Sequence, residues 1–158
     1  MSMDSLDLKA LQFLMAEGRA AWSDLATELG LSGPSSAERV HRMEQQGVIK
    51  GYTAIVNPSS VGCDLTAFVS VTLDHPRSRN AFIALIQNIS EVQECHHIAG
   101  DYDYLLKVRC QNTKDLDRVI SVEIKGFEGV SKTHTTIVLD TVKETSNVPL
   151  SGDFLRSK

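Results

Sequence analysis

The chain has 158 residues, of which 42% are apolar, with a net charge of −4 and a mean hydropathy of −0.11. This length fits one ordinary domain or two small ones, and no apolar run approaches the roughly 18 residues of a membrane helix. The N-terminus lacks the features of a secretory signal, and three cysteines outside any CxxC pattern argue against a disulfide framework and a zinc site. We therefore expect a cytoplasmic protein without a membrane partner, a metal or another cofactor.

The distribution of charge limits how this chain could bind nucleic acid. Residues 1–50 hold five basic and seven acidic residues, and the remainder holds eleven and thirteen, so each part has a net charge of −2. A protein that coats nucleic acid indiscriminately carries the opposite sign. Any DNA binding must come from a local basic patch.

The first 50 residues have the spacing of three short helices. Leu8, Leu11 and Leu14 recur at helical steps and predict a helix over 4–17. A second helix is expected between Ser23, as its N-cap, and Gly30, as its C-terminal stop. Start signals at residues 32–34, with a proline in the first turn, predict a third helix that runs to about residue 46.

The third helix and the turn before it match the helix-turn-helix pattern. Projected at 100° per residue, Ala37, Val40 and Met43 fall on the inward side. The opposite side carries a stripe of polar residues whose chemistry suits phosphates and guanine edges: Ser35, Arg39, Arg42 and Gln46. A merely solvated face is the alternative.

From residue 50 onward the periodicity changes to that of strands. Residues 50–58 predict a short connecting strand that ends at Pro58. The pattern then predicts strand, helix, strand, strand, helix, strand, which is the ferredoxin-like βαββαβ order. The expected elements lie at 65–73, 78–90, 92–99, 103–110, from Thr113 onward (as helix cap), and 133–142.

These elements predict an α+β protein of two modules. We expect a (winged) helix-turn-helix domain at 1–50, a linker strand at 51–60, a ferredoxin-like domain at 61–143 and a polar C-terminal tail at 144–158.

Several stretches in the same order, spread over residues 4–143, resemble the Lrp/AsnC (feast/famine) family of transcriptional regulators. They are residues 26–32 (ATELGLS), 38–44 (ERVHRME), 47–54 (GVIKGYTA), 92–96 (VQECH) and 100–106 (GDYDYLL). One departure is visible, because the family usually has proline directly after the serine that begins the third helix, whereas here Gly33 intervenes before Pro34.

The resemblance implies a sequence-specific DNA-binding regulator whose assembly and DNA affinity respond to a small-molecule effector, commonly an amino acid. It also implies a homo-oligomer built from dimers (a tetramer, an octamer or a larger disc), with the effector bound between sensing modules of adjacent dimers. The candidate DNA contacts are Ser32, Ser35, Ser36, Arg39, Arg42 and Lys50. The candidate effector residues are Gly100, Asp101, Tyr102, Asp103, Thr133, Thr135 and Thr136.

Two other interpretations stay open. Cys95, His96 and His97 suggest a metal site, but on a strand the middle residue faces away from the other two. A sirohaem decarboxylase-like enzyme shares the two-module layout. Such enzymes gather basic residues around a tetrapyrrole pocket and usually have a degraded reading helix, whereas this chain keeps Ser35, Arg39 and Arg42. We therefore expect a protein that is not an enzyme.

Overall fold

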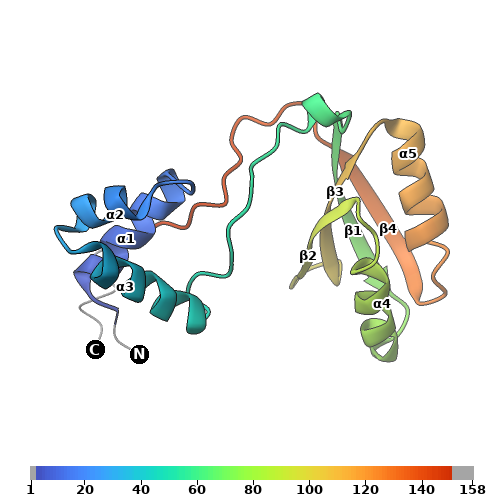
Figure 1. Cartoon of the computed structure of the whole chain (residues 1–158). Helices are drawn as coiled ribbons and strands as arrows, with labels where there is room; N and C mark the ends of the chain where they lie inside the picture. The colour runs from blue at the N-terminus through green and yellow to red at the C-terminus, as the bar shows by residue number, and fades with distance from the viewer. Residues whose placement is uncertain (1–2, 151–158) are drawn as a thin grey trace. The chain divides into compact units, whose positions relative to one another are not determined.

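The computed structural model describes residues 3–150 and divides them into two compact units (Figure 1). The helical unit runs to Ile55 and includes the segment from Glu144. The sheet unit spans Val56–Lys143.

The helical unit contains the three expected helices, α1 (Ser5–Ala16), α2 (Trp22–Leu29) and α3 (Gly33–Gln45). Gly30 ends α2 in the left-handed conformation with φ of 66°, as predicted. The N-cap of α2 is Ala21, so the prediction of Ser23 is wrong; the Asp24 carboxylate accepts the Ala21 amide and replaces a side-chain cap. The core of the unit lies among the three helices and consists of Ala10, Leu25, Leu29, Val40 and Met43.

The linker strand expected at 51–60 is absent, which corrects the sequence analysis. Residues 51–57 form no helix or strand, and a short 3-10 turn follows at Ser59–Val61. A strand needs a ladder of backbone hydrogen bonds, and the four strands of the described sheet pair only with one another. With no paired strand after α3, the helical unit has no β wing in the described residues.

The sheet unit has the predicted βαββαβ order. Its elements are β1 (Leu65–Leu73), α4 (Arg79–Ile86), β2 (Val92–His97), β3 (Tyr104–Cys110), α5 (Thr113–Asp117) with a π-helical extension over Arg118–Ile124, and β4 (Val130–Ile137). The strand order is β2-β3-β1-β4, and every neighbouring pair is antiparallel. A 3-10 turn, Pro76–Ser78, leads into α4, and Asn112 rather than Thr113 caps α5.

The last strand begins and ends earlier than the sequence pattern predicts for 133–142. Its partner β1 begins at Leu65, and the amide of Val138 makes a final hydrogen bond to the carbonyl of Thr66. Beyond that point no strand of the sheet continues, and Leu139 is fully exposed. The β-branched residues there therefore lack a ladder to join.

Both helices of the sheet unit cover one face of the sheet. Alternate residues of β1 and β3, such as Val69 and Leu106, pack against Phe82 of α4 and Val119 beyond α5 in a single core. The opposite face, called the open face here, carries residues of β1, β3 and β4: Phe68, Ser70, Leu105, Lys107 and His134. No helix of this unit packs on the open face.

Candidate nucleic-acid interface and ligand site

The N-terminus of α3 presents two exposed serine hydroxyls. Ser32 caps the helix by accepting the amide of Ser35, and the two hydroxyl oxygens lie 2.8 Å apart. Ser36 is different, because it is fully buried and its hydroxyl donates to the carbonyl of Ser32 at 3.0 Å. The start of α3 therefore offers the hydroxyls of Ser32 and Ser35, while the side chain of Ser36 faces the interior.

Arg39 lies in an acidic pocket formed by α1 rather than on an open stripe. Its guanidinium group contacts Asp4 at 2.7 Å and Asp7 at 2.6 Å, and only 19% of its side chain is exposed. Asp7 itself is 2% exposed. Arg39 donates a hydrogen bond to the Asp7 carboxylate, and this bond raises the pKa of Arg39. Burial acts to raise the pKa of Asp4, but hydrogen bonds donated by the Asp7 amide and by Arg39 outweigh it, so the pKa of Asp4 is lowered. The expectation that Arg39 faces solvent is wrong.

Arg42 contacts both Asp7 and solvent. One terminal nitrogen donates to Asp7 at 2.9 Å, and 49% of the side chain is exposed. Its other guanidinium N–H groups make no hydrogen bond with residues 3–150. Lys50 is exposed just beyond α3. Of the predicted cations, Arg42 and Lys50 are the ones available for phosphate.

The position of Asp7 in the sequence already indicates its ion pairs with the arginines of α3. Asp7 lies four and seven residues before Leu11 and Leu14, on the apolar side of α1, where a carboxylate needs a partner. Arginines on the adjacent helix are the cations that supply it.

The turn between β2 and β3 contains the first group of candidate effector residues. Gly100 has φ of 155°, and a Cβ placed on it would meet nothing within 4 Å, so backbone conformation rather than crowding requires glycine here. Tyr102 lies over the open face, with its ring 6.2 Å from that of His134 and Lys132 Nζ 5.1 Å from its centre. Asp101 is exposed in the turn.

Asp103 ties this turn to the end of β1. Its amide donates to the carbonyl of Val71 at 2.9 Å, and its carboxylate accepts the amide of Leu73 at 2.8 Å. One carboxylate oxygen is thereby used, and the other has no hydrogen bond among the described residues.

The three candidate threonines of β4 do not share one face. Thr133 and Thr135 lie opposite Val71 and Val69 of β1, on the helix-covered face. Thr136 lies opposite Phe68, on the open face. Within one protomer, Tyr102 therefore lies against the open face and Asp103 contacts the end of β1. The seven candidate residues do not meet at one site.

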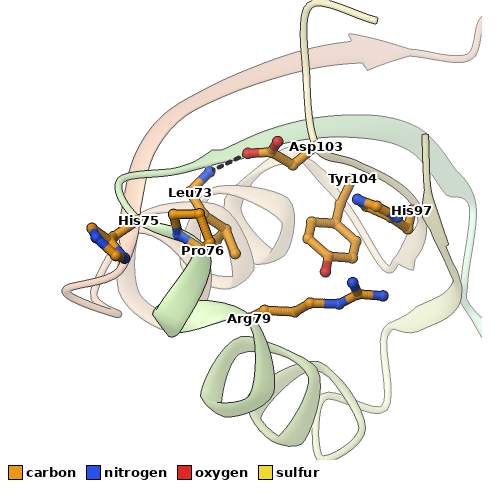
Figure 2. Close-up of a pocket in the computed structure, with 7 residues that line it drawn as sticks. All are labelled: Leu73, His75, Pro76, Arg79, His97, Asp103 and Tyr104. Carbon is orange, nitrogen blue, oxygen red and sulfur yellow. Dashed lines mark hydrogen bonds between the residues drawn. The ribbon is translucent and has the colours of Figure 1, made fainter. Parts of the chain in front are cut away.

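A pocket beside Asp103 was missed by the sequence analysis (Figure 2). It has a volume of about 230 Å³ and is lined by Leu73, His75, Pro76, Arg79, His97, Asp103 and Tyr104. Asp103 is the one predicted site residue among them. The others come from the end of β1 (Leu73), the turn before α4 (His75 and Pro76), the first residue of α4 (Arg79), β2 (His97) and β3 (Tyr104), so only tertiary contacts bring them to one place.

The described residues contain no cluster of three or more metal-ligating side chains. Cys95 and His97 lie opposite Leu106 and Tyr104 of β3, on the face away from His96. Among the residues described, none of the helices is both long and apolar enough to span a membrane.

Sequence profiles of two families match both units. The family described as the AsnC-type helix-turn-helix domain matches residues 3–44, and the one described as the Lrp/AsnC ligand binding domain matches residues 66–148.

Characterised relatives span nearly the whole chain. The leucine-responsive regulatory protein of Haemophilus influenzae is 37% identical over 147 residues, covering 92% of this chain and 89% of the relative. The proline dehydrogenase transcriptional activator of Rhizobium radiobacter is 39% identical over 145 residues, covering 90% and 93%.

Two solved structures of regulatory proteins also match this chain over nearly its whole length. A transcriptional regulator from Neisseria meningitidis in complex with L-methionine has a TM-score of 0.89 at 28% identity, covering 94% of this chain and 97% of that one. A feast or famine regulatory protein from Mycobacterium tuberculosis, also with L-methionine, has a TM-score of 0.86 at 35% identity, covering 93% and 99%. With a three-helix unit, a βαββαβ unit and both family profiles in order, this chain belongs to the Lrp/AsnC family of transcriptional regulators.

Proposed function

We propose that this protein regulates transcription in the cytoplasm by binding double-stranded DNA through α3, under the control of a small amino acid. The observation that carries the DNA-binding part is the set of donors exposed along α3: the Ser32 and Ser35 hydroxyls at its N-terminus and the half-exposed Arg42 in its last turn. Hydroxyls at a helix start and a guanidinium group farther along the same helix are donors that fix a reading helix on phosphates and base edges.

The charges of α3 divide the proposed DNA contacts into two kinds. Arg42 and Lys50 are exposed and can each neutralise a phosphate. Arg39 is held by Asp4 and Asp7, so its main effect on DNA binding is through the position of α3. Ser36 is buried and we do not include it among the contacts.

The DNA-binding proposal is tested with a duplex selected from a random pool by the full chain. Arg42→Ala should weaken binding and reduce the slope of log affinity against log salt by about one, because one phosphate contact is lost. The matched control is Arg19→Ala, an exposed arginine of the helical unit outside α3. If Arg42→Ala and Arg19→Ala bind equally, α3 is not the DNA-contacting helix.

We propose an apolar amino acid as the effector, bound near the β2–β3 turn and the candidate residues of β4. Support comes from a relative named as leucine-responsive and from two solved structures of similar proteins in complex with L-methionine. A thermal-shift screen of the twenty L-amino acids should give a clear increase in Tm for one of them, because a ligand that binds the native state stabilises it by mass action. No increase with any of the twenty would contradict an amino-acid effector.

We also propose a homo-oligomer built from dimers that pair through the open face. Phe68 and Leu105 are apolar residues on this face, which the helices of the unit leave uncovered, and uncovered apolar residues on a sheet are typical of an interface. Pairing adds DNA-binding units, and linked contacts raise avidity beyond that of a single weakly charged unit. Phe68→Glu should yield smaller particles in light scattering, and an unchanged mass would place the interface elsewhere.

The alternative, a sirohaem decarboxylase-like enzyme, is less well supported. The relatives are named regulators, and the pocket of about 230 Å³ is small even for a drug-sized ligand. We propose that the chain is not an enzyme. Titration with an iron tetrapyrrole, followed by absorbance, should give no spectral shift; a stoichiometric shift would favour the enzyme.

A further inference from the structure

The carboxylate of Asp7 is a buried anchor between α1 and α3. Asp7 is 2% exposed. Its Oδ1 accepts hydrogen bonds from Arg39 at 2.6 Å and from Arg42 at 2.9 Å. Its Oδ2 accepts the amide of Asp4 at 3.0 Å and a second hydrogen bond from Arg42 at 3.1 Å. Since the two oxygens of a carboxylate offer about four acceptor sites, this carboxylate is saturated and its orientation is fixed.

The two arginines bound to Asp7 differ in what they leave free for DNA. Arg39 gives the same terminal nitrogen to Asp4 and Asp7, and only 19% of its side chain is exposed. Arg42 gives only Nη2 to Asp7, and 49% of its side chain is exposed. The Nε and Nη1 groups of Arg42 make no hydrogen bond with residues 3–150. Asp7 therefore holds one nitrogen of Arg42 and leaves the remaining N–H groups for an acceptor on DNA.

The ion pairs also cancel the charge of these arginines. Two carboxylates, of Asp4 and Asp7, contact the two guanidinium groups of Arg39 and Arg42. Arg42 therefore adds less to the general attraction of α3 for phosphates than an uncompensated cation would. A held arginine has also lost part of the rotamer freedom that any contact would cost. Such an arginine favours DNA whose acceptor lies where its free N–H groups already are.

We propose that Asp7 is a positioning residue that makes the Arg42 contact selective for the correct DNA site. On the correct duplex, Nε and Nη1 of Arg42 meet an acceptor while Nη2 stays on Asp7. On other DNA no acceptor lies in that place, and Asp7 keeps Arg42 from reorienting toward a phosphate. The inference rests on the DNA-binding function proposed for α3. It adds that selectivity is set from α1, by a buried side chain that does not itself touch DNA.

The test compares the full chain on its selected duplex and on a scrambled duplex of the same length. Asp7→Asn keeps the shape of the side chain and removes its charge. The ratio of the two affinities should fall about tenfold, because the released Arg42 loses its orientation on the selected duplex and contacts phosphates of the scrambled one. On the scrambled duplex, the slope of log affinity against log salt should steepen by about one. A merely structural role would weaken binding to both duplexes and would not steepen that slope.

Asp4→Asn is the matched control. Asp4 belongs to the same capping box and contacts Arg39, but it makes no hydrogen bond to Arg42 among the described residues. Its substitution removes the same charge and should leave the ratio of the two affinities unchanged. Asp7→Asn should also leave that ratio unchanged in an Arg42→Ala background, because the effect of Asp7 passes through Arg42.

Arg42→Lys is a second variant that leaves α1 intact, so it tests the proposal even if Asp7→Asn folds poorly. A lysine keeps the charge but lacks the planar fork of the guanidinium group. Affinity for the selected duplex should fall about tenfold, while affinity for the scrambled duplex stays the same. Equal losses on both duplexes would contradict an oriented contact.

The outcomes separate this proposal from the one on which it rests. If Arg42→Ala binds DNA as well as Arg19→Ala does, both proposals are overturned. If Arg42→Ala weakens binding but Asp7→Asn leaves the affinity ratio unchanged, only the positioning role of Asp7 is overturned. A fall in the ratio that persists in the Arg42→Ala background also overturns it. A fall that requires Arg42 supports it.

Discussion

The arginines of α3 in the helical unit and the first arginine of α4 in the sheet unit differ in how they are paired. In the helical unit, Arg39 and Arg42 are already paired with Asp7. In the sheet unit, Arg79 and the Tyr104 hydroxyl line a cavity without a partner among the described residues. The first arrangement supports a rigid surface that is ready for DNA, whereas the second leaves donors that a ligand can satisfy.

This difference separates stability from binding. Removing Asp7 from the helical unit leaves Arg39 with Asp4 as its carboxylate partner and takes from Arg42 the carboxylate that it contacts, which lowers folding stability. Removing an unpaired group from the sheet unit changes ligand affinity and costs the free protein little. Substitutions of paired groups in the helical unit should therefore change folding stability, whereas substitutions of unpaired groups in the sheet unit should change ligand affinity.

The largest effect is expected for Asp7→Ala, which should lower the free energy of unfolding of the helical unit by about 2–3 kcal/mol. The substitution removes the acceptor of two arginines together with the capping box at the start of α1. Urea unfolding followed by Trp22 fluorescence measures it, because Trp22 is the only tryptophan and lies in α2.

Asp24→Ala is the matched control for that experiment. Asp24 makes the same capping bond to its N-cap amide but has no arginine partner, so its loss should cost about 0.5–1 kcal/mol. If the two substitutions cost the same, the Asp7–arginine pairs add nothing beyond the cap, and the contrast between the two units fails.

A second comparison uses two glycines, one in each unit. A Cβ on Gly33 or on Gly100 would meet no atom within 4 Å, but only Gly100 has a positive φ, at 155°. Gly100→Ala should lower stability by about 1 kcal/mol because its backbone conformation is unfavourable with a Cβ. Gly33→Ala in α3 should raise stability by about 0.5 kcal/mol because alanine loses less entropy in a helix. Thermal unfolding of both variants measures the difference, and shifts of the same sign would contradict it.

The sequence predicted the fold because the spacing of apolar residues along the chain indicates each helix and strand. Leu8, Leu11 and Leu14 indicated α1, and the alternation along β1 indicated a half-buried strand, so the order of elements is confirmed. The strand expected at 50–58 is absent, because a strand needs a partner strand, and the local sequence pattern does not reveal whether one is available. The final strand ended early for the same reason, since β1 supplies no ladder beyond Thr66.

The candidate sites were less predictable, because they depend on contacts between distant residues. The projection of α3 placed Arg39 on the outer side, but it cannot show that Asp4 and Asp7, more than thirty positions earlier, lie beside it. Arg79 and Tyr104 are 25 positions apart in sequence, and only the packing of α4 against the sheet brings them to one cavity. Asp103 was among the candidates because it lies in the stretch 100–106 that resembles the Lrp/AsnC family.

The smallest effect is expected at Tyr52, because this residue is 53% exposed and solvent screens the hydrogen bond that its hydroxyl donates to Glu44 of α3 at 2.8 Å. Burial, with help from Glu44, raises the pKa of Tyr52 from 10.0 to about 12. The unfolded chain loses this proton at the lower pH, so the stabilisation is complete below pH 10 and is lost as pH rises toward 12. Parent and Tyr52→Phe should therefore differ in urea midpoint at pH 9, and the gap should close above pH 10. Other alkaline groups act equally on both proteins, so a gap that stays constant with pH would mean that the Tyr52 proton does not stabilise the helical unit. Glu44→Gln keeps an acceptor but removes its charge, and it should shift the closing of the gap to lower pH.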